Sequence, residues 1–320
     1  MAIWLKGCGY SRRTMKKLAI ATTDSSFDEP MAVLAEARWT DLPAILASEL
    51  TGSAVRRSAR QAASLAIAEA VERRAMFTLH QWSPSEIPAS STGWAAGEDS
   101  LDAWRRASLE VLERVAYCGF LRGEVGLLEM ATDALDEWRL SRYRLVAELY
   151  RAVEPRSVAV VVCHLTDPTG RGPRSSVGVA ADFDEGSAAR SALLEAMKAR
   201  MWAYQLDRRS APTDDWTKPV ERLMYFAGAR SSDRCSALFR QAVVGRSRLE
   251  IDRDAVTDPD HRIRAAGSQL ECTLVTHDLP ESLQRELPVS CPLAFVMSDA
   301  STIAPVSVTL DGELLPNPHA

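Results

Sequence analysis

Residues from Ser58 to about Phe77 place apolar side chains around almost the whole circumference of a helix. Such a helix is usually buried, because every face of it would expose apolar surface to water. Burying it requires other helices or strands around it. The chain of 320 residues, 46% hydrophobic and 25% charged, contains enough apolar material for such a core.

Further helices and strands are expected along the chain, and they interleave. Helices are expected at about 31–37, 101–117, 126–153 and 187–204, with Gly119 as the stop signal of the second. Strands are expected at 157–163, 177–181, 270–276 and 293–297. This mixed order predicts an α+β fold with mixed β-sheets. Because no Pro/Gly/Ser linker divides the chain, we expect a single domain at 45–320, after an N-terminal segment of uncertain role at 1–44.

Charge and cysteine content argue against several classes of protein. The net charge is −5, from 38 basic and 43 acidic residues, which argues against a general nucleic-acid binder. No apolar run approaches the roughly 18 residues of a membrane helix, and the N-terminus lacks a signal-peptide core. The six cysteines lack zinc-site spacing and are expected to be free thiols in a reducing cytoplasm. They are Cys8, Cys118, Cys163, Cys235, Cys272 and Cys291.

Two of the expected helices carry the same Glu-x-x-Glu-Arg motif. Its residues are Glu69, Glu72 and Arg73 in the first helix, and Glu110, Glu113 and Arg114 in the second. Positions three apart lie on one face of a helix, so the two carboxylates of each pair project together and repel one another unless a cation lies between them. In the apolar first helix water is scarce, and buried carboxylates need partners or metal ions.

If these two helices pack side by side, four carboxylates converge. Oxygen ligands suit Mg²⁺, which usually binds together with nucleotide phosphates, and the two arginines can add phosphate contacts. A single motif of this kind is most often a solvated helix face with ion pairs, so that alternative stays open. The chain has no P-loop, so a nucleotide site here must be of another kind.

The stretch Ser91-Thr-Gly-Trp-Ala-Ala-Gly97, followed by the second motif, resembles the YcaO family. The hallmark of that family is a Ser-Asn-Gly-x-Ala-x-Gly loop leading into a Glu-x-x-Glu-Arg helix. Ser58 to Arg73 is similar to the family's first helix, and Glu195 to Arg200 is similar to its third motif, Glu-x-x-Gln-x-Arg. Looser matches keep the family's order from about residue 45 onward. They are Asp167 to Gly170, Ala266-Gly267 and Thr276 to Asp278.

The resemblance implies a YcaO-like α+β fold and an ATP-dependent enzyme of peptide natural-product biosynthesis. Such an enzyme cyclodehydrates Cys, Ser or Thr of a ribosomal peptide to an azoline. An alternative product is a thioamide, made with an external sulfur donor. ATP and Mg²⁺ are the implied cofactors. The implied metal ligands are Glu69, Glu72, Glu110, Glu113, Glu98 and Asp102, and the implied nucleotide contacts are Ser58, Arg73, Arg114, Lys198 and Arg200.

The same resemblance implies partners and a location. We expect a precursor peptide as substrate, and a leader-peptide-binding or E1-like protein as partner. A homo-oligomer is a further expectation, whereas nucleic acid and membrane are not expected as partners. The expected location is the cytoplasm.

Several positions depart from the family pattern. Leu65, Thr92, Val115 and Lys198 stand where Ser, Asn, Asp and Gln are usual. These differences leave a second class of function open, a non-catalytic YcaO-like subunit that binds peptide or a partner protein. Trp94, ahead of the second motif, either stacks on adenine or packs in the core.

Overall fold

The computed structural model describes residues 17–25, 32–82, 92–207, 229–246, 258–280, 292–299, 307–310 and 313–316. The chain divides into two compact units. Unit 1 comprises Met1–Phe27, Met31–Val111 and Leu274–Asp299, and unit 2 comprises Asp28–Pro30, Leu112–Thr273 and Ala300–Ala320. Ser91, Cys8 and Cys291 lie outside the described residues. The expected single domain at 45–320 stays a prediction.

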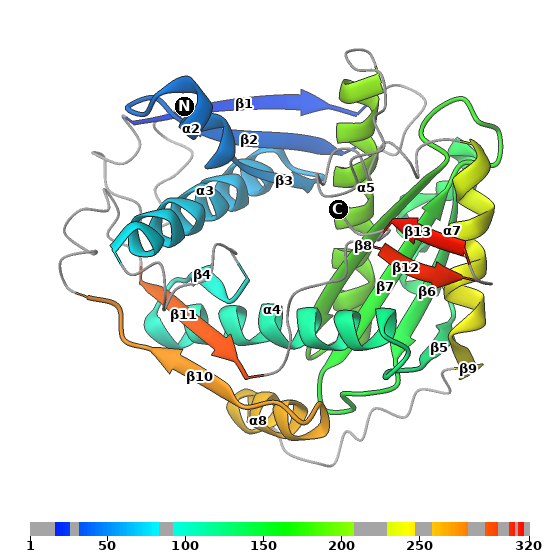
Figure 1. Ribbon diagram of the computed structural model, residues 1–320. Coiled ribbons are helices and arrows are strands. Elements are labelled where there is room, and N and C mark those ends of the chain that lie inside the picture. The colour runs from blue at the N-terminus through cyan, green and yellow to red at the C-terminus, as the bar shows by residue number, and fades with distance from the viewer. Residues whose placement is uncertain are drawn as a thin grey trace. The chain divides into compact units, whose positions relative to one another are not determined.

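A three-stranded antiparallel sheet and one long helix form the first part of unit 1 (Figure 1). The strands are β1 (Leu18–Asp24), β2 (Val33–Trp39) and β3 (Gly52–Arg56), with the short helix α2 (Ala44–Glu49) between β2 and β3. Helix α3 (Ala59–Trp82) packs on β2 and β3 and buries eight side chains, from Ala62 to Leu79. The helix expected at 58–77 is confirmed, with five more residues at its C-terminal end.

The short helix expected at 31–37 is wrong, because this segment is strand β2. Buried Ala35, Ala37 and Trp39 alternate with the less buried Glu36 and Arg38. Side chains alternate between the two faces of a strand, so this period of two fits a strand that has one face on α3.

A second antiparallel sheet in unit 1 has the order β10-β11-β4. Its strands are β4 (Trp94–Ala96), β10 (Leu274–His277) and β11 (Leu293–Ser298). The strand expected at 293–297 is confirmed, and the strand expected at 270–276 is present but begins four residues later, at Leu274. Trp94 is 1% exposed and stacks on Phe295 with ring centroids 4.4 Å apart. Of its two expected roles, Trp94 therefore has the packing one.

A five-stranded sheet of order β8-β7-β6-β5-β9 forms the centre of unit 2. Its strands are β5 (Leu127–Met130), β6 (Val146–Ala152), β7 (Ala159–Thr166), β8 (Ser175–Asp182) and β9 (Val243–Arg246). Only the β5–β9 pair is parallel among the described strands of this sheet. Helix α5 (Glu185–Asp207) packs on β7 and β8, and confirms the helix expected at 187–204.

The other elements of unit 2 are short. They are the 3₁₀ helices η1 (Asp133–Trp138) and η2 (Leu140–Tyr143), the helices α7 (Ala229–Gln241) and α8 (Pro259–Gln269), and the hairpin of β12 (Ser307–Leu310) and β13 (Glu313–Pro316). None of the helices in the described part of the chain has the length and hydropathy needed to cross a membrane. The four described cysteines, Cys118, Cys163, Cys235 and Cys272, are free and buried.

The helix expected at 126–153 is wrong, because this segment forms β5, η1, η2 and β6. Residues 127–130 pair with residues 149–152, and β6 then pairs with β7. Pairing with buried neighbours outweighs the local helix preference of such short segments.

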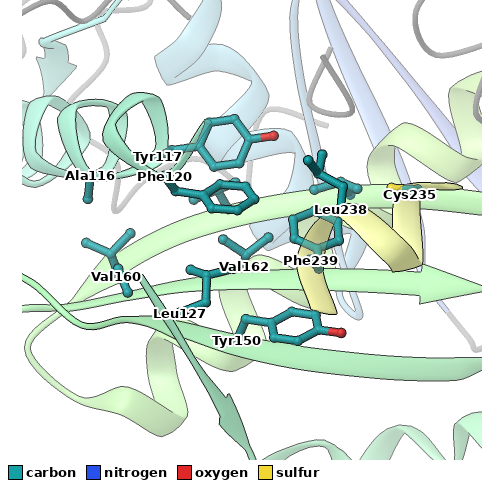
Figure 2. Packing of buried hydrophobic residues seen from close by; sticks show 13 residues of the cluster. Ala116, Tyr117, Phe120, Leu127, Tyr150, Val160, Val162, Cys235, Leu238 and Phe239 are labelled. Atoms are coloured by element: carbon teal, nitrogen blue, oxygen red, sulfur yellow. The ribbon is translucent and has the colours of Figure 1, made fainter. Parts of the chain in front are cut away.

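Helix α4 (Ser100–Leu121) begins in unit 1 and ends in unit 2. It confirms the helix expected at 101–117, but the stop expected at Gly119 is wrong. The helix continues because its last turn carries Phe120 into the core of unit 2. Figure 2 shows this core, where Phe239 of α7 stacks on Phe120 and on Tyr150 with centroids 5.5 and 5.4 Å away.

The two units contain the same structural motif, three antiparallel strands followed by a long helix. Strands β2 and β7 begin 126 residues apart in the sequence, and so do helices α3 and α5. The same spacing separates Gly52 from Gly178, the glycines on strands β3 and β8. It also separates two ion pairs, Asp41–Arg74 at 3.0 Å and Asp167–Arg200 at 3.1 Å. We interpret the two motifs as copies of one internal repeat.

The last strand of each repeat touches its helix backbone to backbone. A Cβ atom added to Gly52 would lie 2.0 Å from the carbonyl oxygen of Ala66 on α3. A Cβ atom added to Gly178 would lie 2.1 Å from the carbonyl oxygen of Ala192 on α5. Only glycine allows an approach this close.

A buried polar network joins three strands of unit 2. His164 donates or accepts through Nδ1 at 2.9 Å from Glu148 and through Nε2 at 2.7 Å from Ser175. Burial by itself lowers the pKa of His164, but the Cys235 thiol and the Glu148 carboxylate outweigh it and raise that pKa to about 9. Ser175 is 1% exposed, so this Ser–His–Glu arrangement lies in the interior and ties the strands together.

Gly178→Ala tests the close contact between β8 and α5. The added methyl group collides with helix backbone, so the free energy of unfolding should fall by about 1–3 kcal/mol or more. Gly245→Ala is the matched control, because a Cβ atom there meets only Leu128, at an ordinary 3.5 Å. Urea denaturation followed by circular dichroism measures both. Equal midpoints for the two variants would contradict the close contact.

Candidate functional site

Helix α3 presents the first glutamate pair to two different strands of unit 1. Glu69 accepts a hydrogen bond from the Ser53 amide of β3 at 2.7 Å, and its other oxygen lies 2.6 Å from Arg73. Glu72, one turn later, accepts a hydrogen bond from the Ala96 amide of β4 at 2.7 Å. Each carboxylate is therefore fixed by a backbone donor outside its own helix.

Glu110 on the first half of α4 joins these two in unit 1. It accepts a hydrogen bond from the amide of Gly93 at 3.3 Å, immediately before β4. Glu72 and Glu110 are thus both held by the short segment from Gly93 to Ala96. Unit 1 contains three of the four glutamates expected in the site, and each accepts a hydrogen bond from a backbone amide.

The negative charge of Glu72 is only partly compensated by its positive neighbours. The pKa of Glu72 is raised to about 7, mainly by burial and in smaller part by the charge of neighbouring Glu69, although Arg106, the Ala96 amide and Arg73 act in the opposite direction. A carboxyl group shifted this far is typical of a functional site, because a purely structural role gains nothing from the cost of burying the charge.

The fourth glutamate, Glu113, lies one turn beyond Glu110 on α4 and belongs to unit 2. Its pKa is raised to about 7, mainly by burial and in smaller part by the charge of Glu195 of α5. Arg114, Lys198 and a hydrogen bond from the Ala181 amide of β8 lower that pKa. Lys198 lies 2.5 Å from Glu195. Unit 2 therefore holds its own cluster of two carboxylates and one ammonium group.

Arg200, expected at the nucleotide, is 2% exposed in the structure. Its guanidinium group donates to the carboxylate of Asp167 at 3.1 Å and to the carbonyl of Pro173, and lies over the ring of Tyr204. Asp167 also accepts from the amides of the loop that follows β7. These contacts hold the loop before β8 in place.

The other expected site residues lie at helix starts. Ser58 is exposed and comes directly before α3. The Asp102 carboxylate accepts from the Glu98 amide at 3.0 Å, and the Asp102 amide donates to Asp99 at 2.8 Å. Contacts of this kind satisfy the free amides at the start of α4. A metal role for Glu98 and Asp102 stays a prediction.

Sequence reasoning missed two kinds of group. Arg106 acts on Glu72 and donates to the Ala96 carbonyl; its place four residues before Glu110 on one helix was a usable signal. The amides of Ser53, Gly93 and Ala96 carry no side-chain signal at all, because any residue except proline supplies an N–H group.

The carboxylates fit a divalent cation by their chemistry. They are hard oxygen ligands, and Glu72 and Glu113 both lack full charge compensation. Within the described ranges, no three His, Cys, Asp or Glu side chains are close enough to hold a metal ion by themselves. Mg²⁺ commonly takes one or two carboxylates and completes its shell with phosphate and water, so the donors present fit a magnesium nucleotide.

Comparison with known proteins gives one family. The family model described as YcaO cyclodehydratase, ATP- and Mg²⁺-binding, matches residues 77–273. No curated protein matches the chain.

Solved structures share the fold at low sequence identity. A YcaO protein from Methanopyrus kandleri, bound with AMPPCP and Mg²⁺, has a TM-score of 0.63 and 17% identity over 94% of this chain and 90% of its own. A heterocyclase in complex with substrate and cofactor has a TM-score of 0.60 and 10% identity, over 90% of this chain and 50% of its own. The Escherichia coli microcin synthetase McbBCD complex with pro-MccB17 bound has a TM-score of 0.58 and 12% identity, over 88% and 87%.

Glu72→Gln should stabilise the chain in metal-free buffer above pH 7. A pKa raised from 4.5 to about 7 means that ionisation opposes folding. This penalty is absent below about pH 4.5, grows between pH 4.5 and 7, and is complete above pH 7. A glutamine keeps the bond from the Ala96 amide without the charge, so we expect a gain of about 1–3 kcal/mol at pH 8. Urea denaturation at pH 5 and pH 8 measures it.

Glu129→Gln provides the control for that measurement. Glu129 is 53% exposed and pairs with Arg246, so its replacement should change the free energy of unfolding by less than about 1 kcal/mol at either pH. A Glu72→Gln chain that is no more stable than the parent at pH 8 would show that Glu72 carries no buried charge.

Proposed function

The chain belongs to the YcaO family, and on that basis we propose that it uses ATP and Mg²⁺ to modify a backbone amide of a ribosomal precursor peptide. The product we propose is an azoline, formed by cyclodehydration at Cys, Ser or Thr. The observation that carries the proposal is the fixed set of four glutamates. Each accepts a hydrogen bond from a backbone amide of another element.

Backbone anchoring is the arrangement that cation binding requires. A carboxylate held by an amide is oriented before its ligand arrives, so binding loses little side-chain entropy. Each glutamate also keeps lone pairs beyond the one that the amide uses. Two of the four lack full charge compensation, and a cation would supply it.

Mg²⁺ bound with ATP would neutralise charge that develops on the transferred phosphoryl group. In this proposal Glu69, Glu72 and Glu110 of unit 1 and Glu113 of unit 2 are metal ligands. Arg114 and Lys198 add positive charge near Glu113 and contact phosphate.

Two other expected nucleotide contacts, Arg73 and Arg200, differ in their partners and in their exposure. Arg73 lies 2.6 Å from Glu69 and its side chain is 33% exposed, so we propose that it contacts phosphate from this partly exposed position. Arg200 is buried against Asp167, so we propose that it acts by holding the loop before β8.

Partners belong to the same proposal. Two structurally similar proteins were solved with a substrate, one of them as a complex of several proteins. We propose a precursor peptide as substrate and a leader-peptide-binding or E1-like protein as partner. A homo-oligomer and a cytoplasmic location stay predictions.

Isothermal titration with AMPPCP and Mg²⁺ tests the nucleotide site. We expect binding to the parent chain, and at least a tenfold weaker affinity for Glu69→Gln in unit 1 and for Glu113→Gln in unit 2. Each change removes one negative charge from the set that holds the cation. Glu129→Gln, exposed and outside both clusters, should bind as the parent does. Unchanged affinity in both site variants would overturn the four-glutamate model.

Mass spectrometry of a precursor peptide tests the chemistry. The chain is incubated with ATP, Mg²⁺, the peptide and its partner protein. We expect ATP-dependent loss of one water per modified Cys, Ser or Thr. Exchange of oxygen for sulfur after addition of sulfide would instead identify the thioamide product. Nucleotide binding with no change in peptide mass would favour the non-catalytic subunit.

A further inference from the structure

The internal repeat places a lysine where its first copy has a glutamate. Glu69 and Glu195 are equivalent positions, separated by the same 126 residues as Gly52 and Gly178. Three residues later, the first copy has Glu72 and the second has Lys198. The same framework therefore carries a carboxylate pair in one copy and a carboxylate–ammonium pair in the other.

The frameworks on which these residues sit are closely matched. In each copy a glycine of the last strand contacts the helix backbone at the alanine three residues before the first glutamate. These alanines are Ala66 and Ala192. In each copy an arginine five residues after that glutamate pairs with an aspartate beyond the second strand, at 3.0 and 3.1 Å. Helical position, strand contact and Asp–Arg ion pair all agree, so Glu72 and Lys198 occupy equivalent places in their own units.

Lys198 is engaged with the carboxylates around it. Its ammonium nitrogen lies 2.5 Å from the carboxylate of Glu195, and its charge also acts on Glu113. These are the two carboxylates of the unit 2 cluster. In unit 1 the position equivalent to Lys198 is taken by the carboxylate of Glu72, which accepts a hydrogen bond from the Ala96 amide and lies one turn after Glu69.

We propose that the Lys198 ammonium group takes the place of a divalent cation beside Glu113 and Glu195, so that the unit 2 cluster binds no metal ion of its own. The inference rests on the proposed function, in which the cation that Glu113 helps to bind arrives together with ATP. An ammonium group is a compact charge with three donors, which suits it to carboxylate oxygens. Unlike a metal ion, it is covalently attached and is present at any Mg²⁺ concentration.

A role in a simple surface ion pair explains the position of Lys198 less well. Its side chain is 25% exposed and that of Glu195 is 35% exposed, and a partly exposed pair of this kind adds little to stability. The nearby Glu113 accepts a hydrogen bond from the Ala181 amide of β8, and the positive charges of Arg114 and Lys198 both act on it. Neutralising the negative charge of Glu113 and Glu195 is a role that explains the position of Lys198.

Lys198→Glu tests the inference, because it restores in unit 2 the pair of carboxylates that α3 carries in unit 1. The probe is Mn²⁺ alone, titrated into the full chain without nucleotide and counted by electron paramagnetic resonance of the free ion. We expect one additional Mn²⁺ bound per chain compared with the parent. Lys198→Gln, which keeps the size and removes the charge, should show the same site with weaker affinity.

Arg190→Glu is the matched control, since it makes the same change of charge on the same helix. Arg190 is 41% exposed and contacts Asp184 and Ser187. It lies five residues before Glu195 on α5, so the two side chains do not share a helix face. It should leave the Mn²⁺ count of the parent unchanged. Circular dichroism confirms that each variant is folded before it is titrated.

Two results would overturn the inference. One is an Mn²⁺ count for both Lys198 variants that equals that of the parent and of Arg190→Glu. The other is a parent chain that already holds an Mn²⁺ ion which Glu195→Gln removes. Both results concern the difference between variants without nucleotide, so they are separate from a failure of the parent to bind AMPPCP, which would count against the proposed function.

Discussion

The contact of strand backbone with helix backbone at Gly52 and Gly178 is the constraint on which the site depends. It brings β3 against α3 closely enough that the next residue, Ser53, donates its amide to Glu69. It brings β8 against α5, and Ala181 of the same strand donates to Glu113. A side chain at either glycine would push strand and helix apart and move these donors away from their carboxylates. The packing of strand on helix therefore also sets the geometry of the site.

The structure places charge where burial disfavours it. Backbone hydrogen bonds compensate part of the loss of water around Glu72 and Glu113, yet the pKa of each remains near 7. A fold selected for stability alone would replace such groups with neutral ones. Their presence on helices that are otherwise lined with alanine, leucine and valine is the physical argument for a ligand that carries positive charge.

Helices with strong patterns could be predicted from the sequence, and side-chain motifs within them located the glutamates. The helices expected at 58–77, 101–117 and 187–204 are present, and the family expected from the motifs is the one to which the chain belongs. The segment at 126–153 was misassigned because its strands are defined by partners distant in the sequence. The motif at 195–200 predicts a nucleotide contact for Arg200, and this stays a prediction. Its burial against Asp167 could not be predicted from the motif, because it depends on a loop 33 residues earlier.

The donors that hold the glutamates also determine which substitutions the site can tolerate. An N–H group belongs to the backbone, so Ser53 and Ala96 could exchange side chains over evolutionary time without altering the hydrogen bond, provided that proline is avoided. Gly93 is different, because its φ of +82° favours glycine and a Cβ atom there would lie 1.9 Å from the carbonyl oxygen of Val296. Leu65, Thr92 and Val115 depart from the family pattern, and none of them supplies one of these amides. Sequence drift around the site can therefore proceed while the carboxylates keep their places, and identity between relatives understates how much of the architecture they share.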